Sequence, residues 1–289
     1  ELDCNTNKLT ELIVKGCTTL QKLDCSVNQL TALDVQGLTS LQKLDCPNNQ
    51  LTSLDVQGLT SLQELTCNQN QLTTLGVKGC TSLQKLECSA NQLGTLDVQG
   101  LTALQELKCS GNQLTSLNVQ GCTSLQKLEC PVNQLGTLDV QGLTALQELK
   151  CSGNKLSTLK AQGCTALQEL RCYENQLTSL DLQGLTALQR LSCSDNQLAT
   201  ISVKGCTALQ ELDCHHNKLT AVDVQGLTSL EELKCYGNQI NAEKMTELLK
   251  ALPTRDEDDE AEAKLYTEKT DIVEGNCKDF TKSELKAAF

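Results

Sequence analysis

Eighteen cysteines stand in this chain of 289 residues, and twelve of them recur every 21 residues, from Cys4 to Cys235. Thiols in this number could form disulfides, hold a soft metal ion or act as nucleophiles. The chain contains no C-x-x-C sequence, so it lacks the ligand spacing of zinc fingers and of thioredoxin-like redox sites. The regular interval instead indicates one cysteine per repeated unit.

A second group of residues that could take part in catalysis or metal binding lies in the later repeats. Both histidines of the chain, His215 and His216, are found there. Ser194, His215 and Asp213 have the side chains of a nucleophilic triad, but no oxyanion donors are in evidence beside them. A metal site at the two histidines with Asp195 or Asp213 is a somewhat better alternative. It requires the strand to end before His216, because adjacent strand residues point to opposite sides. We therefore predict no catalytic residue, no cofactor and no metal.

The repeat identifies the elements that must position these side chains. Leu23 and Cys25 alternate with Lys22, Asp24 and Ser26, which is the period of two expected of a strand. One such strand per repeat, stacked on the next, makes a parallel sheet with leucine and cysteine facing inward. The return segment of each coil has a glycine at its turn in eleven of the twelve coils and is too short for a full helix. We expect extended or 3₁₀-like return segments and gentle curvature.

Stacked strands also limit what the thiols can do. Side chains in register on parallel strands point the same way, whereas a disulfide needs a Cβ–S–S–Cβ dihedral of about 90°. We therefore predict buried, unbridged thiols that act as small hydrophobic side chains. An asparagine follows each cysteine of the series by three residues, where its amide can hydrogen-bond backbone groups that the turn leaves unpaired. The predicted structural residues include Cys25, Cys46, Cys130, Cys172, Asn28, Asn49, Asn133 and Asn175.

Residues 20–30 have the spacing L-x-x-L-x-C-x-x-N-x-L, which resembles the leucine-rich-repeat consensus with cysteine in place of its central leucine. The period and the row of cysteines are similar to those of bacterial internalin J-type surface proteins. The resemblance covers residues 2–240 and implies a leucine-rich-repeat solenoid of the α/β horseshoe class, rich in β-structure, with a parallel concave sheet of about twelve coils. It also implies a non-enzymatic protein-binding or adhesion module, extracellular or on the bacterial cell surface.

On such a scaffold the outward side chains of the concave sheet are the ones that recognise partners. In the middle coils these side chains alternate in charge, as in Lys85, Glu106, Lys127 and Glu148. Each charge then has opposite charges on both neighbouring strands, an arrangement that explains these residues without any ligand. We interpret the middle coils as a spacer.

Larger side chains reach this face only in the later coils. Tyrosine and arginine dominate interface hot spots because they supply contact area and hydrogen bonds at modest entropic cost. We expect Ser194 to leave a notch between Tyr173 and His215. Drift on a solvated strand face is the alternative interpretation. The predicted binding patch consists of Arg171, Tyr173, Arg190, Ser194, Asp195, Asp213, His215, His216 and Tyr236.

The composition changes after Ile240, which predicts a solenoid at residues 1–240 and a C-terminal capping region at residues 241–289. Asn241 can cap a helix whose apolar residues recur at helical spacing before Pro253 stops it. We expect this helix to cover the last coil.

Three further features are expected in the capping region. Residues 256–262 are interpreted as a solvated acidic loop, residues 263–267 as a strand, and Thr281 as the start of a second helix. That helix breaks off at Phe289, and the chain begins inside a strand. We therefore expect further sequence at both ends.

The composition bounds the choice of partner. The chain has 36 acidic and 24 basic residues, which gives a formal net charge of −12. This charge disfavours a nucleic-acid partner, because affinity for nucleic acid rests largely on neutralising its phosphates. No apolar run approaches the roughly 20 residues that cross a bilayer, so we expect no membrane insertion in this segment. We expect a monomer that recognises protein rather than glycan. The alternatives are a passive spacer or stalk and an engineered consensus scaffold.

Overall fold

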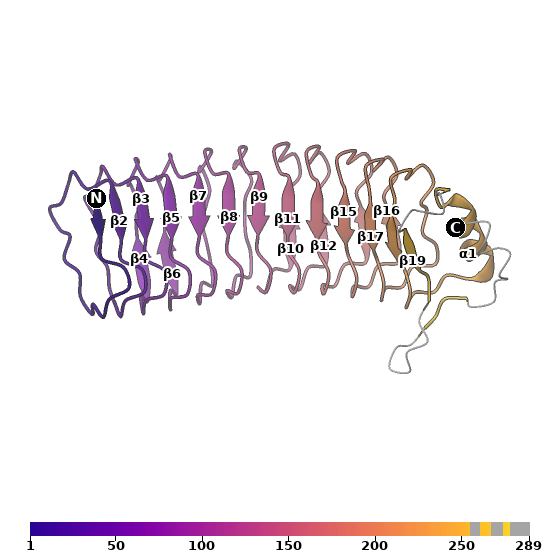
Figure 1. The fold of residues 1–289 in the computed structure, drawn as a ribbon, viewed down its shortest axis with the longest axis horizontal. Coiled ribbons are helices and arrows are strands. Elements are labelled where there is room, and N and C mark those ends of the chain that lie inside the picture. Colours follow the sequence, from indigo (N-terminus) through magenta and orange to yellow (C-terminus); the bar gives the residue numbers. More distant parts are fainter. Residues whose placement is uncertain (255–260, 267–273, 278–289) are drawn as a thin grey trace. The chain divides into compact units, whose positions relative to one another are not determined.

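One short strand per coil builds the sheet of the solenoid, and neighbouring strands pair in parallel (Figure 1). The structure is a computed structural model that describes residues 1–254, 261–266 and 274–277. It comprises two units, residues 1–139 and residues 140–289, and each is described by itself.

In the first unit, equivalent residues of successive coils lie opposite one another, as Leu44 with Leu65 and Leu65 with Leu86. The return side of the coils carries β4 (Ser53–Asp55) and β6 (Thr74–Gly76), which pair in parallel, and β10 (Thr137–Asp139). These extended return segments confirm the prediction. The main strands, in spatial order, are β1 (Leu2–Asp3), β2 (Lys22–Asp24), β3 (Lys43–Asp45), β5 (Glu64–Thr66), β7 (Lys85–Glu87), β8 (Glu106–Lys108) and β9 (Lys127–Glu129).

The second unit repeats this arrangement and then departs from it. Its return side carries β12 (Thr158–Lys160), β14 (Ser179–Asp181) and β16 (Thr200–Ser202), and a helix, α1 (Ala242–Ala251), follows the last regular coil. Its main strands, in spatial order, are β11 (Glu148–Lys150), β13 (Glu169–Arg171), β15 (Arg190–Ser192), β17 (Glu211–Asp213), β18 (Glu232–Lys234) and β19 (Glu262–Lys264).

Leucine, valine and cysteine fill the interior of both units. Leu62, Leu65 and Cys67 of one coil, for example, have no exposed surface. All eighteen cysteines are thiols outside any disulfide, and the ladder cysteines from the second coil onward are buried, as predicted. Cys4 is half-buried and Cys17 is exposed because the first coil of this chain packs against a neighbour on one side only. The ladder thiols therefore serve as packing groups.

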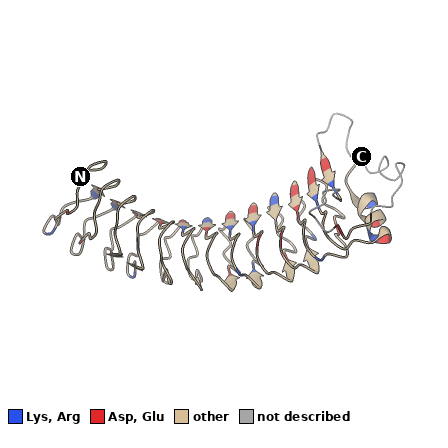
Figure 2. Cartoon of the chain, turned by 90° about the horizontal axis from the view of Figure 1, so that it is seen from below, with Lys and Arg blue, Asp and Glu red and all other residues tan. Residues whose placement is uncertain are grey.

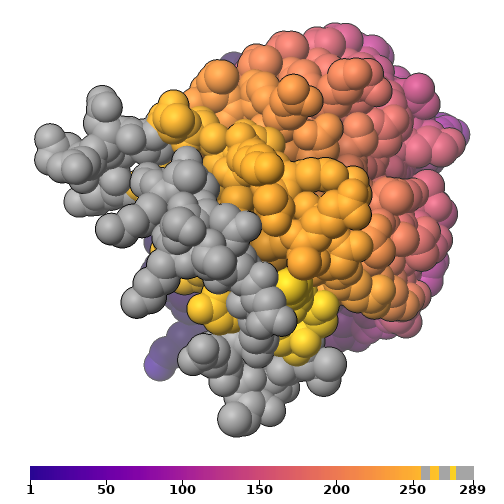
Figure 3. All heavy atoms as spheres, turned by 90° about the vertical axis from the view of Figure 1, so that its right-hand side faces the viewer, coloured from indigo at the N-terminus to yellow at the C-terminus, as the bar shows by residue number. Residues whose placement is uncertain are grey.

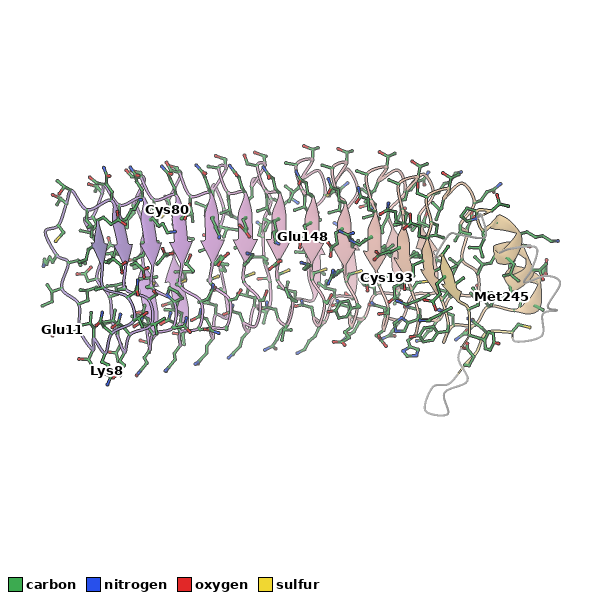
Figure 4. All side chains as sticks on the ribbon, in the orientation of Figure 1. Lys8, Glu11, Cys80, Glu148, Cys193 and Met245 are labelled. Atoms are coloured by element: carbon green, nitrogen blue, oxygen red, sulfur yellow. The ribbon has the colours of Figure 1, made fainter. Side chains whose placement is uncertain are left out.

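The second set of cysteines does more than pack. The thiol of Cys80 donates to the carbonyl of Val56, 3.0 Å away, and that of Cys206 donates to the carbonyl of Leu182 at 3.2 Å. Each bond joins one coil to the coil before it. A leucine at the same position packs in the interior but cannot donate such a bond. Cys80 is labelled in Figure 4, as is the ladder residue Cys193.

The asparagine ladder joins neighbouring coils as predicted. Asn70 donates from Nδ2 to the carbonyls of Cys67 in its own coil, at 3.1 Å, and of Cys46 in the preceding coil, at 3.0 Å. Its Oδ1 accepts from the backbone N–H of Leu51 at 3.0 Å. One buried amide thus satisfies backbone groups of two coils, which would otherwise be left without partners inside the turn.

Ion pairs form a network both along and between strands of the first unit, and the predicted cross-strand pairs are Glu87 with Lys108 and Lys85 with Glu106, at 2.9 and 3.9 Å. Figure 2 shows acidic residues in red and basic residues in blue. The Glu87 carboxylate lies 3.0 Å from Lys85 Nζ and 2.9 Å from Lys108 Nζ. Lys108 also contacts Glu106 at 2.6 Å. Burial alone would raise the pKa of the Glu87 carboxyl, but hydrogen bonds from Lys108 and Lys85 and their positive charge lower it to about 2.

A lowered carboxyl pKa predicts a pH-dependent contribution to stability. The Glu87 carboxylate stabilises the folded state above its ordinary pKa of 4.5, and this contribution is lost as the pH falls toward 2. We expect Glu87→Gln to lower the free energy of unfolding by about 1 kcal/mol at pH 7 and by much less at pH 2. Urea unfolding at the two pH values, followed by circular dichroism, measures the difference.

The control for this experiment is Glu64→Gln, which removes a carboxylate that is 47% exposed and 3.2 Å from Lys43. An exposed ion pair contributes little, so the control should change the free energy of unfolding at pH 7 by about 0.3 kcal/mol. An effect of Glu87→Gln that is equal at both pH values would contradict the proposed role of the network.

The helix α1 begins and packs as the sequence predicts. Asn241 accepts a hydrogen bond from the Lys244 N–H at 2.9 Å and so caps the first turn. Met245, Leu248 and Leu249 are buried, and the helix ends before Pro253. Figure 3 looks onto this end of the second unit, where the helix residues are orange.

The ladder of the second unit continues past Ile240. Strand β19 pairs in parallel with β18, and Leu265 is buried directly after it, in the position that cysteine holds in other coils. Asn276 accepts from the Ile240 N–H at 2.9 Å and donates to the carbonyls of Cys235 and Leu265 at 2.8 Å each. Residues 261–266 and 274–277 thus supply the strand and the asparagine of one more coil.

Other predictions for the C-terminal region have different outcomes. The expected strand lies at Glu262–Lys264, slightly earlier than 263–267. Most of the acidic run and the helix expected from Thr281 lie outside the described residues. The division of the chain at residue 240 stays a prediction.

Candidate functional site

A hollow of about 160 Å³ opens on the strand face of the second unit. It is lined by residues of β13, β15, β17 and β18, among them Arg190, and by Tyr173. In the parallel register Arg171 pairs with Ser192 and Ser192 with Asp213. Ser192 is the small residue between two larger ones, so its side chain leaves the space that its neighbours surround.

Ser194 does not line this hollow, and the notch expected there stays a prediction. Ser194 is buried, with 4% of its surface exposed. The sequence does contain a signal for the actual hollow, because Ser192 interrupts a row of charged residues, Lys150, Arg171, Asp213 and Lys234.

The two arginines give one side of the hollow its positive charge. Arg171 Nε lies 2.5 Å from Glu169 Oε1, and Arg190 Nη2 lies 3.8 Å from Glu169 Oε2. Their side chains nevertheless remain 48% and 46% exposed. Asp213 and Glu211 line the same hollow. It therefore offers both cations and carboxylates to an entering group.

An aromatic cluster adjoins the hollow. The rings of His215 and Tyr236 are stacked, with centroids 4.6 Å apart and an angle of 14° between their planes. The His216 ring meets both edge-on, at 4.7 Å from His215 and 5.3 Å from Tyr236. Asp213 links the cluster to the hollow, because it lines the hollow and also contacts Nδ1 of His215.

The backbone explains how two consecutive histidines reach the same cluster. Strand β17 ends at Asp213, and His216 has a φ of 49°, in the left-handed region that non-glycine residues rarely adopt. In the next coil Gly237 makes room for the ring, because a Cβ there would lie 2.4 Å from His216 Cδ2. The condition stated for a shared site, that the strand ends before His216, is therefore met, and Gly237 is a site residue that the sequence analysis missed.

Carboxylates surround the two imidazoles. His216 Nδ1 lies 3.0 Å from Asp195 Oδ1, and His215 Nε2 lies 3.6 Å from Asp195 Oδ2. The ligand atoms of Asp195, His215 and His216 all lie within 4.8 Å of one another. Burial raises the pKa of the Tyr236 hydroxyl above its ordinary value of 10.0, and Asp213 adds to the rise, so this hydroxyl stays protonated and able to donate at neutral pH.

The structure therefore brings the predicted patch together as two adjoining parts. Arg171, Tyr173 and Arg190 line the hollow, and Asp213 is shared with the aromatic cluster. The remaining exposed or half-buried members, which are Asp195, His215, His216 and Tyr236, form that cluster. Ser194 belongs to neither part.

Comparisons with known proteins agree with this architecture. The family model for leucine-rich repeats in two copies matches residues 18–59, 39–79 and 165–205. The functional domain of InlJ from Listeria monocytogenes, which includes a cysteine ladder, is 32% identical, with a TM-score of 0.65 over 83% of this chain and 63% of that one. YopM, a leucine-rich effector protein from Yersinia pestis, is 26% identical, with a TM-score of 0.65 over 82% of this chain and 71% of its own.

Two further results limit what can be concluded about function from the comparisons. The structure of TLR13 in complex with ssRNA13 is 23% identical, with a TM-score of 0.61 over 82% of this chain and 40% of TLR13, and at that identity it shows the fold alone. No curated protein sequence matches the chain.

The chain contains leucine-rich repeats at residues 18–79 and 165–205 and folds as a parallel-sheet solenoid, with α1 as the helix among the described residues. Like the functional domain of InlJ, it includes a cysteine ladder, and it spans 63% of the InlJ chain. Among the described residues, no helix is long and apolar enough to span a bilayer.

Proposed function

We propose that this protein is a non-enzymatic binding module that recognises a protein partner through the patch around the hollow, on a bacterial cell surface or after secretion. The observation that carries the proposal is the combination of a side-chain-sized hollow, two half-exposed arginines and a stacked aromatic pair on one face. Such anchors around a small pocket are the usual composition of an interface hot spot. The likeness to InlJ, a protein of Listeria monocytogenes, supports the bacterial setting.

The size of the hollow favours a macromolecule over a small ligand. Small-molecule sites enclose about 300–1,000 Å³, whereas this hollow holds about 160 Å³ and is open on one side. That volume accommodates one side chain of a partner. The carboxylates of Glu211 and Asp213 beside the arginines suit a mixed polar surface better than a polyanion, in keeping with the net charge of −12. A protein partner fits these features better than a glycan or a nucleic acid.

The burial of Ser194 argues against a nucleophilic triad with His215 and Asp213. The hydroxyl of a serine nucleophile must reach the substrate carbonyl, whereas Ser194 has 4% of its surface exposed. The contact of Asp213 with Nδ1 of His215 is compatible with a binding role for the histidine.

The double variant Tyr173→Ala/Tyr236→Ala tests the patch. The wild-type chain is first used to probe an array of purified extracellular proteins and glycans, and the affinity for any bound partner is then measured by surface plasmon resonance. We expect the double variant to weaken binding by about 100-fold, because each tyrosine anchors one part of the patch. The matched control, Lys85→Ala/Glu106→Ala, alters the ion-pair network of the first unit and should leave the affinity unchanged.

A passive spacer is the second candidate function, and the ion-pair network of the first unit favours it. Lys85, Glu87, Glu106 and Lys108 satisfy one another across β7 and β8, so this surface needs no partner. Unchanged binding by the tyrosine double variant would remove the patch from the proposal. Failure of the wild-type chain to bind any protein or glycan would favour the spacer.

A further inference from the structure

Three side chains from two neighbouring coils direct ligand atoms toward a common point. His216 Nδ1 lies 3.0 Å from Asp195 Oδ1, and His215 Nε2 lies 3.6 Å from Asp195 Oδ2. Neighbouring ligand atoms of a tetrahedral zinc ion lie about 3.3–3.5 Å apart, because zinc–nitrogen and zinc–oxygen bonds measure about 2.0–2.2 Å. The two observed distances lie on either side of that range. All three ligand atoms lie within 4.8 Å of one another, so small side-chain movements would complete the coordination.

We propose that Asp195, His215 and His216 form a site for a divalent transition-metal ion such as Zn²⁺. Imidazole nitrogen with one carboxylate is a ligand set that zinc accepts, and it is unlike the all-oxygen set that calcium and magnesium prefer. Three protein ligands leave a fourth position for water or for a side chain of a partner. The site is a property of this chain and does not depend on the proposed function.

The surrounding residues hold the ligands in place. Asp213 contacts Nδ1 of His215, which leaves Nε2 of the same ring to face the metal position. A carboxylate on the far nitrogen of a ligating histidine fixes the tautomer and the ring orientation, and it is the usual companion of zinc-binding histidines. Tyr236 stacks on the His215 ring from the next coil. Asp213 is thus a positioning residue for the site.

The backbone fixes the position of the second histidine, His216. Its left-handed backbone and the absence of a Cβ at Gly237 place the His216 ring beside Asp195. Within the described residues, His216 Nε2 is buried without a hydrogen-bond partner, so Nδ1 is the nitrogen that is turned toward the carboxylate. Two carboxylates, Asp195 and Asp213, also lie against the two imidazoles, and this local negative charge favours a divalent cation.

Zinc binding to the full chain tests the proposal. Isothermal titration is done under argon in a Cys17→Ser background, because Cys17 is an exposed thiol and thiolates bind zinc. We expect one equivalent of Zn²⁺ to bind, and we expect no such binding in the double variant His215→Ala/His216→Ala. Asp213→Asn should weaken binding by about 10–100-fold, the usual effect of losing the carboxylate that orients a ligand. The control Asp181→Asn removes an exposed carboxylate of β14 and should bind as the background does.

Two further measurements separate this site from the cysteines. Co²⁺ bound in place of Zn²⁺ should show d–d absorption without the charge-transfer band that a thiolate ligand produces. Zn²⁺ should raise the unfolding temperature of the background protein but not that of the histidine double variant, because only a ligand of the folded state stabilises it. Equal zinc affinity in the double variant, a thiolate band with Co²⁺, or no binding of Zn²⁺ to the background protein would each overturn the proposal.

Discussion

Above pH 9 this protein is expected to lose its stability steeply, although no catalytic or binding group is involved. The cause is the cysteine ladder. Burial raises the pKa of the thiols of Cys88, Cys130 and Cys172 from an ordinary value of 9.0 to about 12. Burial likewise raises the pKa of seven more ladder thiols, to about 12 or well above the ordinary value. Ten buried ladder thiols thus share the same direction of shift.

The sign of the effect follows from proton linkage. The folded-state pKa values are raised, so the contribution of these thiols is fully present below pH 9 and is lost as the pH rises toward 12. In that window the unfolded chain has released protons that the folded chain retains. Each thiol then lowers the free energy of unfolding by about 1 kcal/mol per pH unit. Ten thiols together lower it by on the order of 10 kcal/mol per pH unit. That amount is comparable with the whole stability of an ordinary domain.

Urea unfolding at pH 7.5, 9 and 10 in the presence of a reductant measures this loss as a fall in the midpoint. The double variant Cys88→Ala/Cys109→Ala removes two of the ten thiols and should lose stability with pH about one fifth less steeply. Cys17→Ala is the matched control, since it removes an exposed thiol, and its pH dependence should equal that of the unchanged protein. An identical pH dependence in the double variant would contradict the assignment to the ladder.

Asn133→Ala is expected to destabilise the first unit by about 2–4 kcal/mol, because it leaves several buried backbone groups without partners. The Asn133 amide donates to the carbonyls of Cys109 and Cys130 at 3.0 and 3.1 Å, and its Oδ1 accepts from the Leu114 N–H at 3.0 Å. Alanine can replace none of these bonds, and the site is too enclosed for water to replace all of them. The free energy of unfolding in urea is the measurement.

Two companion variants make the interpretation specific. Gln92→Ala removes an exposed amide of the same unit and should change the free energy of unfolding by less than about 0.5 kcal/mol. Asn133→Asp keeps the shape and the acceptor but loses both donors and buries a charge, so it should destabilise at least as much as alanine does. A cost for Asn133→Ala no greater than that of Gln92→Ala would contradict the structural role of the ladder.

Much of this architecture follows from local pattern. The alternation around Leu23 and Cys25 indicates a strand with one buried face, and the constant interval places equivalent residues opposite one another. The asparagine three residues after each cysteine indicates a buried amide at the strand end. Because each coil contacts only its neighbours, a regularity along the chain becomes the same regularity in space. The predicted thiol burial, asparagine bonds and ion-pair network are confirmed for that reason.

The site depends on departures from the repeat, and these are less visible in sequence. Ser194 is buried, and the hollow lies at Ser192, the small residue of a charged row. The left-handed backbone at His216 brings two consecutive side chains to one cluster, and Gly237 in the next coil admits the ring. Neither fact follows from the residue types within a single coil.

The period, the inward face and the asparagine and cysteine ladders are thus properties of the amino-acid pattern, since each arises from contacts that recur at a constant separation along the chain. The hollow at Ser192, the convergence of His215 and His216 on Asp195, and the use of Asn276 to extend the ladder were settled only by the folded structure. Each of these depends on where a strand stops and on which backbone region the following residues enter. Packing against the neighbouring coil determines both, because the local conformational preference of these residues is weaker than the energy of their contacts with that coil.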